Sequence, residues 1–126
     1  MLFIGVDLGS TNIKATAYDE TFKFLGRESV PVTYVRSGPV VEFDAEIYYD
    51  SLVEILARLL DQPGVGREDV KQIVFTGQAE SLVVLDKNGK ALMRALSWMD
   101  ERSVDECEEL AEKFDNLLCE AVTGQQ

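Results

Sequence analysis

The first eighteen residues contain an apolar run and an alternating stretch, which together predict two short β-strands. Residues 2–6 form an apolar run that suits a strand covered on both faces. Residues 13–18 place Ile13, Ala15 and Ala17 on one side and more polar residues on the other, as in a strand with one wetter face. We therefore expect the chain to begin with a β-hairpin whose turn contains residues 7–12.

The next stretch predicts a third strand and a helix. Residues 22–32 are expected to form a strand, which Pro31 restricts to the edge of a sheet because proline has no N–H to donate. Apolar residues then recur at three- and four-residue spacing, which predicts an amphipathic helix over residues 45–60. Asp44 is its expected N-cap, because an aspartate oxygen can accept the free N–H groups of a first helical turn.

The remaining pattern predicts two more strands and a second helix. Residues 70–76 have an apolar centre that predicts a buried strand, and residues 82–85 are a fifth short strand before an Asn-Gly turn. An acidic helix is expected from Ser103 onward. Its apolar stripe would contain Val104, Cys107, Ala111, Phe114 and Leu118. This order of strands and helices indicates an α/β layer structure.

The first predicted turn carries more polar groups than a reversal of direction requires, and these groups suit the terminal phosphates of a nucleotide. Gly9 lets the backbone approach a ligand, so that successive N–H groups can converge on an oxyanion. Asp7 suits Mg²⁺ or a metal-bound water. The other polar side chains of the turn belong to Ser10, Thr11, Asn12 and Lys14. An ordinary hairpin turn is the alternative, and neither G-x-x-x-x-G-K-S/T nor G-x-G-x-x-G is present.

Two further polar clusters lie where α/β sheets usually carry their sites, beyond the ends of strands. In the first, Gln78 and Glu80 flank Ala79 and could bind the hydroxyls of a polyol. In the second, Trp98 offers a flat apolar face for a sugar, while Asp100 and Arg102 could bind sugar hydroxyls or each other. The alternative interpretation is that these are ordinary loop residues and that Asp100 caps the last helix.

Composition narrows the class of protein. A chain of 126 residues, 46% of them hydrophobic, has room for one domain with a core. Its formal net charge of −11 argues against a nucleic-acid partner, and no apolar run is long enough to span a membrane. Cys107 and Cys119 would lie about 18 Å apart on one helix, too far to pair, which favours reduced thiols in a cytoplasmic protein. Because these 126 residues contain no histidine, a His-based catalytic triad is excluded within this stretch.

Four short motifs, in this order, resemble those of the FGGY family of carbohydrate kinases. They are the D-x-G-S-T turn at Asp7, the G-Q-x-E cluster at Gly77, the L-D-x-x-G turn at Leu85 and the W-x-D-x-R segment at Trp98. The combination most resembles xylulokinase- and gluconokinase-like members. Ala79-Glu80 replaces the Met-His of the xylulokinase pattern, and glycerol kinases carry Arg-Glu there, so the resemblance does not identify the sugar.

The resemblance implies an α/β domain of the actin-like ATPase, ribonuclease-H-like type, with a mixed five-stranded sheet and flanking helices. Residues 1–126 would be a partial N-terminal domain of such a kinase. Its first phosphate motif would match Asp7, Gly9, Thr11 and their neighbours, its sugar loop Gln78, Ala79 and Glu80, and its segment beside the sugar pocket Trp98, Asp100 and Arg102.

The function implied is transfer of phosphate from ATP to a hydroxyl of a pentulose, sugar acid or polyol, with Mg²⁺ held near Asp7 through water. The family's catalytic-base aspartate, second phosphate motif and adenosine pocket have no counterpart here, so we expect the chain alone to be inactive. Apolar surface left uncovered would favour self-association, for example as a homodimer. The alternative is a non-catalytic sugar- or phosphate-binding module of the actin- and Hsp70-like superfamily.

Overall fold

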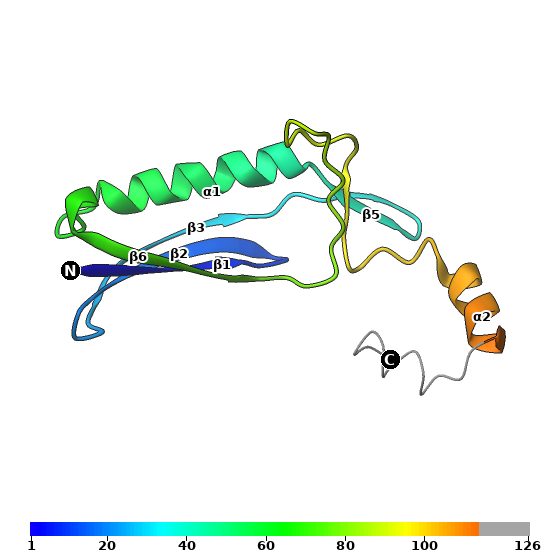
Figure 1. Ribbon diagram of the computed structural model, residues 1–126, viewed down its shortest axis with the longest axis horizontal. Coiled ribbons are helices and arrows are strands. Elements are labelled where there is room, and N and C mark those ends of the chain that lie inside the picture. The colour runs from blue at the N-terminus through cyan, green and yellow to red at the C-terminus, as the bar shows by residue number, and fades with distance from the viewer. Residues whose placement is uncertain (114–126) are drawn as a thin grey trace.

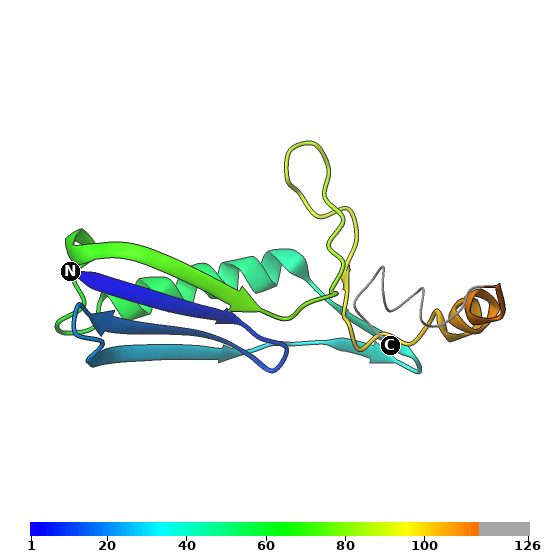
Figure 2. The ribbon, with the colours of Figure 1, turned by 60° about the horizontal axis from the view of Figure 1, so that its bottom comes forward.

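The structure, a computed structural model, describes residues 1–113, which contain a mixed four-stranded sheet. Strands β1 (Leu2–Leu8), β2 (Asn12–Asp19) and β3 (Phe24–Pro31) form an antiparallel meander. Strand β6 (Val70–Gly77) lies parallel to β1 on its other side, which gives the order β3-β2-β1-β6 (Figure 1 and Figure 2). The predicted first hairpin is thus confirmed, and β3 is an edge strand with Pro31 at its end.

The strand registers bring two loops together. Leu8, the last residue of β1, is aligned with Ile13 of β2 and with Gly77 of β6. The turn after β1 and the segment after β6 therefore leave the same end of the sheet side by side. The chain positions of these two loops differ by about seventy residues, and the parallel pairing of β1 with β6 joins them.

Helix α1 (Ala45–Leu60) covers one face of the sheet (Figure 1). Its predicted N-cap is confirmed, because the Asp44 carboxylate accepts the backbone N–H groups of Glu46 at 3.0 Å and Ile47 at 3.1 Å. Ile55 and Leu59 on α1 are fully buried. They pack with the sheet residues of the core, which are Leu2, Ile4, Val6, Ile13, Ala15 and Ala17, and with Val65 from the loop after the helix. Alternation in β2 thus buries Ile13, Ala15 and Ala17 as predicted.

Two expectations of burial are wrong. Gly5 is exposed, so β1 is covered on one face and not on both. The apolar centre of β6 is also exposed, with Ile73 40%, Val74 54% and Phe75 54% accessible. The reason is the position of the helix: α1 packs against β2 and β3, whereas β6 is the edge strand at the far side of the sheet.

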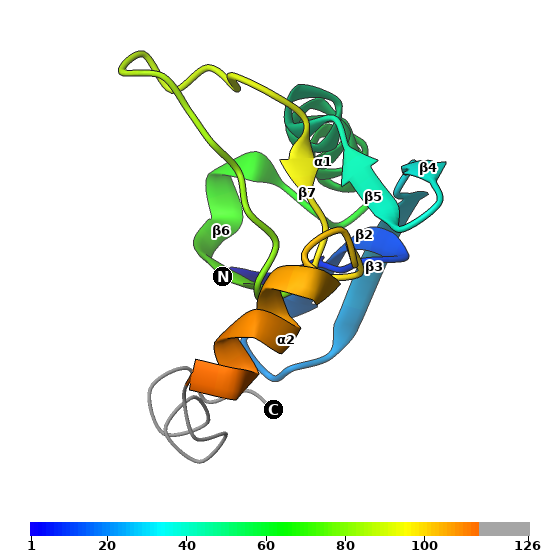
Figure 3. The same ribbon diagram turned by 90° about the vertical axis from the view of Figure 1, so that its right-hand side faces the viewer.

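A second, three-stranded sheet lies beside the first (Figure 3). It consists of β4 (Val35–Ser37), β5 (Val40–Phe43) and β7 (Ala95–Leu96) in antiparallel order β4-β5-β7.

The expected fifth strand at residues 82–85 is absent from both sheets of the described chain, so the main sheet has four strands and not five. Leu82 and Leu85 make only isolated bridges, to Leu96 and Ala91. The Asp86–Gly89 turn folds residues 85–91 back on themselves, and this loop projects away from the sheet (Figure 2).

The described chain ends in a helix that is not packed against the rest of the described residues. A short 3₁₀ turn (Arg67–Asp69) precedes β6, and helix α2 (Val104–Lys113) follows β7. No residue of α2 is buried, so the stripe that begins at Val104 and Cys107 faces solvent. Phe114, Leu118 and Cys119 lie outside the described residues. Across residues 1–113, no helix has both the length and the apolar character needed to cross a membrane.

Candidate functional site

The turn between β1 and β2 has every one of its carbonyl oxygens engaged. The donors are the Tyr48 hydroxyl to Gly9 at 3.1 Å, the Tyr34 hydroxyl to Ser10 at 2.9 Å and the Val32 N–H to Thr11 at 3.0 Å. A planar trans peptide places each carbonyl opposite the next N–H. The N–H groups of Ser10 and Thr11 therefore point away from these donors, and among residues 1–113 neither donates to a protein acceptor.

Gly9 is required at this turn by space. A Cβ atom there would lie 2.7 Å from the backbone oxygen of Asn12 and 3.4 Å from an Asp7 carboxylate oxygen. Gly77, at the end of β6, is equally confined, because a Cβ would lie 2.7 Å from Cβ of Leu8 and 2.8 Å from its backbone oxygen. Gly9 thus lets the β1–β2 turn close, and Gly77 lets the end of β6 approach the end of β1 closely.

A closed ring of hydrogen bonds joins the turn to the two other predicted clusters. The N–H of Gln78 donates to the Leu8 carbonyl at 2.9 Å, and the Ser81 hydroxyl donates to Oε1 of Gln78 at 3.1 Å. The backbone N–H of Trp98 donates to Oγ of Ser81 at 3.2 Å. The indole N–H of Trp98 closes the ring by donating to Oγ of Ser10 at 2.9 Å. Residues distant in sequence are therefore held in fixed relation.

These residues surround an open hollow of about 290 Å³. Its lining consists of Ser10, Gln78, Ala79, Glu80 and Trp98, all of them predicted site residues. Glu80 has a φ of 66°, a left-handed conformation that costs a non-glycine residue about 1 kcal/mol. A hydroxyl, an amide, a carboxylate and an indole face around a small hollow can bind a compound with several hydroxyls.

Asp7 and Lys14 lie apart from this hollow. They are cross-strand neighbours in β1 and β2, and their charged groups are 3.6 Å apart, with both side chains nearly half exposed. Because Ile4 and Val6 face the helix, strand alternation places Asp7 on the opposite face of the sheet. There the two side chains line a second open hollow of about 280 Å³.

The described residues contain no cluster of three or more carboxylate, histidine or cysteine side chains that could enclose a metal ion. A lone carboxylate such as Asp7 does fit Mg²⁺, because this ion keeps several waters and takes one or two carboxylates together with substrate phosphates.

Asp100 and Arg102 bind each other and the protein, and they do not line the hollow. Arg102 donates to both Asp100 oxygens at 2.7 Å and to Oε1 of Glu42 at 2.7 Å. Asp100 also accepts the backbone N–H of Val41 at 2.7 Å. The hydrogen bond from Arg102 is the main reason that the pKa of Asp100 lies well below its usual range. This pair fixes the Trp98 segment to β5.

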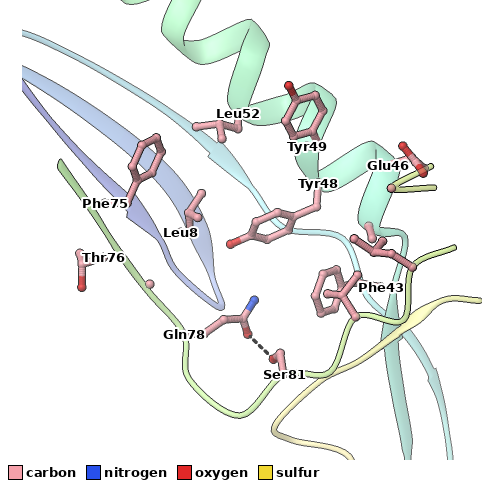
Figure 4. Close-up of a pocket in the computed structure, with 15 residues that line it drawn as sticks. Leu8, Phe43, Glu46, Tyr48, Tyr49, Leu52, Phe75, Thr76, Gln78 and Ser81 are labelled. Atoms are coloured by element: carbon pink, nitrogen blue, oxygen red, sulfur yellow. Dashed lines mark hydrogen bonds between the residues drawn. The ribbon is translucent and has the colours of Figure 1, made fainter. Parts of the chain in front are cut away.

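A larger open cavity, of about 620 Å³, lies between α1 and the end of β6 (Figure 4). Its walls are mostly apolar, with Leu8, Leu52 and Phe75 among them, and Gln78 and Ser81 lie at one side (Figure 4). Tyr48 projects from α1 into this space. Burial raises the pKa of Tyr48 to about 12.

Several contributors to the site have no distinctive sequence signal. Tyr48 lies in the apolar stripe of the helix and is indistinguishable there from a core residue, and Tyr34 is an isolated loop residue. Ser81 directly follows the predicted Gln78–Glu80 cluster, but the sequence assigns it no role. Glu42 belongs to the Val-Glu-Phe-Asp stretch before the helix, but its bond to Arg102 joins residues 60 positions apart. Only the tertiary structure could show these contacts.

The chain is similar in sequence and in fold to known proteins. A family model described as "FGGY family of carbohydrate kinases, N-terminal domain" matches residues 2–126. The glycerol kinase of Xanthobacter autotrophicus is 32% identical over 96% of the chain, and the xylulose kinase of Bacillus subtilis is 31% identical over 91%. The crystal structure of xylulose kinase from Rhodospirillum rubrum has a TM-score of 0.84 at 27% identity over 96% of the chain.

The structural likeness confirms the expected actin-like α/β fold class. The chain spans about a quarter of the length of these relatives, 25%, 23% and 25% respectively. The likeness to the family thus extends over nearly the whole chain. It includes both the short motifs and the fold. The chain belongs to the FGGY family of carbohydrate kinases, and the part of the family that it matches is the N-terminal domain.

Proposed function

We propose that this chain is the N-terminal part of an ATP-dependent kinase that phosphorylates a hydroxyl of a pentulose, sugar acid or polyol. The observation that carries this proposal is the hydrogen-bonded ring that joins Ser10 of the first turn to Gln78 and Trp98. It holds a group of phosphate-binding type next to groups of sugar-binding type. A phosphotransferase needs this proximity, because catalysis of phosphoryl transfer is mostly positioning and charge stabilisation.

The turn after β1 would hold the terminal phosphates of ATP. Its donors would be the N–H groups of Ser10 and Thr11, which have no protein acceptor among residues 1–113, and the hydroxyl of Ser10. Asn12 is next in the chain, and Lys14 would supply a positive charge from the face of the sheet that carries Asp7. Gly9 lets the turn adopt this shape, since a side chain there would collide with the turn itself. Asp7 would hold Mg²⁺ through bound water, and the ion would supply neutralisation of phosphate charge.

The sugar or polyol would occupy the hollow beside the turn. Gln78 and Glu80 would bind its hydroxyls, the small side chain of Ala79 leaves room, and the Trp98 ring would cover its apolar face. Asp100 and Arg102 would act through Trp98, because their hydrogen bonds are made to each other and to β5. We place the protein in the cytoplasm, where an exposed thiol such as that of Cys107 stays reduced.

The chain by itself is expected to lack turnover. We assign no general base to residues 1–113, and the relatives carry about three quarters of their length outside the matched part. The test compares the 126-residue chain with the product of the complete reading frame, each given Mg·ATP and a panel of pentuloses, sugar acids and polyols. The longer protein should phosphorylate at least one compound, and the chain alone should give no product above buffer.

The residue-level version of this test uses Glu80→Gln in the longer protein. This change should raise KM for the preferred sugar by about tenfold or more, because it removes a charged acceptor of hydroxyl groups. Glu20→Gln, at an exposed turn far from the hollow, is the matched control and should leave KM unchanged. Sugar binding without any turnover in the longer protein would instead identify a non-catalytic binding module.

A further inference from the structure

We infer that Trp98 is a positioning residue for the hydroxyl of Ser10, which it orients as a hydrogen-bond donor toward a phosphate. The inference rests on the proposed function of the turn and adds to it a specific link between the sugar side and the phosphate side of the site. Trp98 was expected only to offer its ring to a sugar. The structure gives its indole N–H a separate partner, 88 residues away in the sequence.

The direction of this hydrogen bond fixes what the Ser10 hydroxyl can do. An indole N–H can only donate, so at 2.9 Å the Ser10 oxygen must accept. A hydroxyl that accepts with one lone pair still has its own O–H to donate. Within the described chain, the Ser10 hydroxyl donates to no protein acceptor, and the adjacent N–H groups of Ser10 and Thr11 are also unpaired. All three donors thus lack a protein acceptor among residues 1–113, and an anion bound at the turn would be their acceptor.

The backbone around Trp98 is anchored by hydrogen bonds, which lets the indole act as a fixed donor. The backbone N–H of Trp98 donates to Ser81, and the preceding residue, Ser97, donates its N–H to the Val41 carbonyl at 3.0 Å. Asp100 adds a bond to the Val41 N–H from the other side of the segment. Trp98 as a residue is 52% exposed and lines the hollow. A sugar stacked on this ring would contact the same side chain that orients Ser10.

The expected magnitude follows from the strength of one hydrogen bond. Losing the orienting donor leaves the Ser10 hydroxyl free to rotate, so phosphate binding should weaken about three- to tenfold. Because Trp98 acts only through Ser10, removing both side chains should weaken binding no more than removing the Ser10 hydroxyl alone. Two independent contacts would instead give multiplied effects.

The test uses the fact that Trp98 is the one tryptophan of the 126-residue chain, so a ¹⁵N-labelled sample gives a single indole N–H resonance. Spectra are recorded for the unmodified chain, Ser10→Ala, Ser10→Thr and Ser37→Ala, each titrated with tripolyphosphate in the presence of Mg²⁺. Ser37 is exposed in β4 and serves as the control for loss of a hydroxyl. Backbone resonances that stay dispersed show that each variant is folded.

Support consists of three results together. Ser10→Ala moves the indole resonance, whereas Ser10→Thr and Ser37→Ala leave it in place. Tripolyphosphate moves it along with the amide resonances of Ser10 and Thr11. Trp98→Phe weakens tripolyphosphate binding three- to tenfold, Ser10→Ala weakens it at least as much, and the double variant binds no more weakly than Ser10→Ala.

The two possible failures are distinguishable. If the turn amides respond to tripolyphosphate but the indole ignores both Ser10→Ala and the ligand, the link is wrong and the phosphate function of the turn stands. If no amide of residues 9–12 responds, the phosphate function fails, and this inference fails with it. Should Trp98→Phe not fold, the indole response to Ser10→Ala decides the question alone.

Discussion

The hydroxyl of Tyr48 on α1 donates a hydrogen bond to the backbone carbonyl of Gly9 at 3.1 Å. This contact connects the helix that covers the sheet to the turn that we propose binds phosphate. It also fixes the orientation of the peptide between Gly9 and Ser10, whose N–H points to the opposite side. Burial raises the pKa of Tyr48 to about 12, so the hydroxyl is protonated and able to donate at neutral pH.

Tyr48→Phe should lower the free energy of unfolding by about 1 kcal/mol, because the Gly9 carbonyl loses its donor. Tyr49→Phe is the matched control, since Tyr49 is the next residue on the helix and 62% exposed. Urea unfolding of both variants measures the difference. Equal stability of the two variants would contradict the role given to Tyr48.

The raised pKa of Tyr48 predicts a further effect in alkali. Tyr48 ionises first in the unfolded state, so its contribution to stability is complete below pH 10 and is lost as the pH rises toward 12.

Gly9→Ala should distort the turn and abolish its binding of tripolyphosphate. The added Cβ would lie 2.7 Å from the backbone oxygen of Asn12, and a backbone atom cannot move aside as the end of a side chain can. Gly5→Ala in β1 is the control, because a Cβ there meets no atom within 4 Å. Isothermal titration with tripolyphosphate and Mg²⁺ compares the two. Unchanged binding by Gly9→Ala would show that the turn does not need its observed shape.

Asp100→Asn should make the chain less stable at pH 7 and less sensitive to acid. The pKa of Asp100 is lowered in the folded state by its hydrogen bond with Arg102. Its stabilising contribution is therefore fully present above the unfolded pKa of about 3.9 and is lost as the pH falls below that value. Urea unfolding measures the free energy of unfolding at pH 7 and at pH 3. The decrease between these two pH values should be smaller for Asp100→Asn than for Asp50→Asn, a change at an exposed position of α1. An identical decrease for both variants would show that the Asp100–Arg102 pair does not contribute to stability.

The 126-residue chain should self-associate through the exposed edge strand β6. An unpaired edge offers free N–H and C=O groups, and here it also exposes Ile73, Val74 and Phe75. Val74→Lys should raise the dissociation constant of the dimer about tenfold or more, because a charge on an edge strand opposes pairing. Val53→Lys on α1 adds the same charge at a residue of similar exposure, 48% against 54%, and should have little effect. Sedimentation velocity over a range of concentrations decides, and a monomer at every concentration would refute this prediction.

The sequence alone was sufficient for features that depend on neighbouring residues. Alternation in residues 13–18 located β2 and its buried face, and the three- and four-residue spacing with Asp44 located α1 and its cap. The order of the short motifs indicated the FGGY family, which the comparisons confirm. These signals are local, because the period of a strand or helix and the needs of a helix end are set within a few residues.

The tertiary structure alone decided which apolar strand is covered and which side chains meet. The run at residues 73–75 has the composition of a buried strand, yet it is exposed because α1 lies over β2 and β3. Residues 82–85 have the composition of a strand, yet Leu82 forms only an isolated bridge, with Leu96. The bond from Trp98 to Ser10 depends on the parallel pairing of β1 with β6 and on the segment anchored at Val41. Periodicity records only the faces of one element, whereas burial and hydrogen bonding between distant residues depend on where the elements pack.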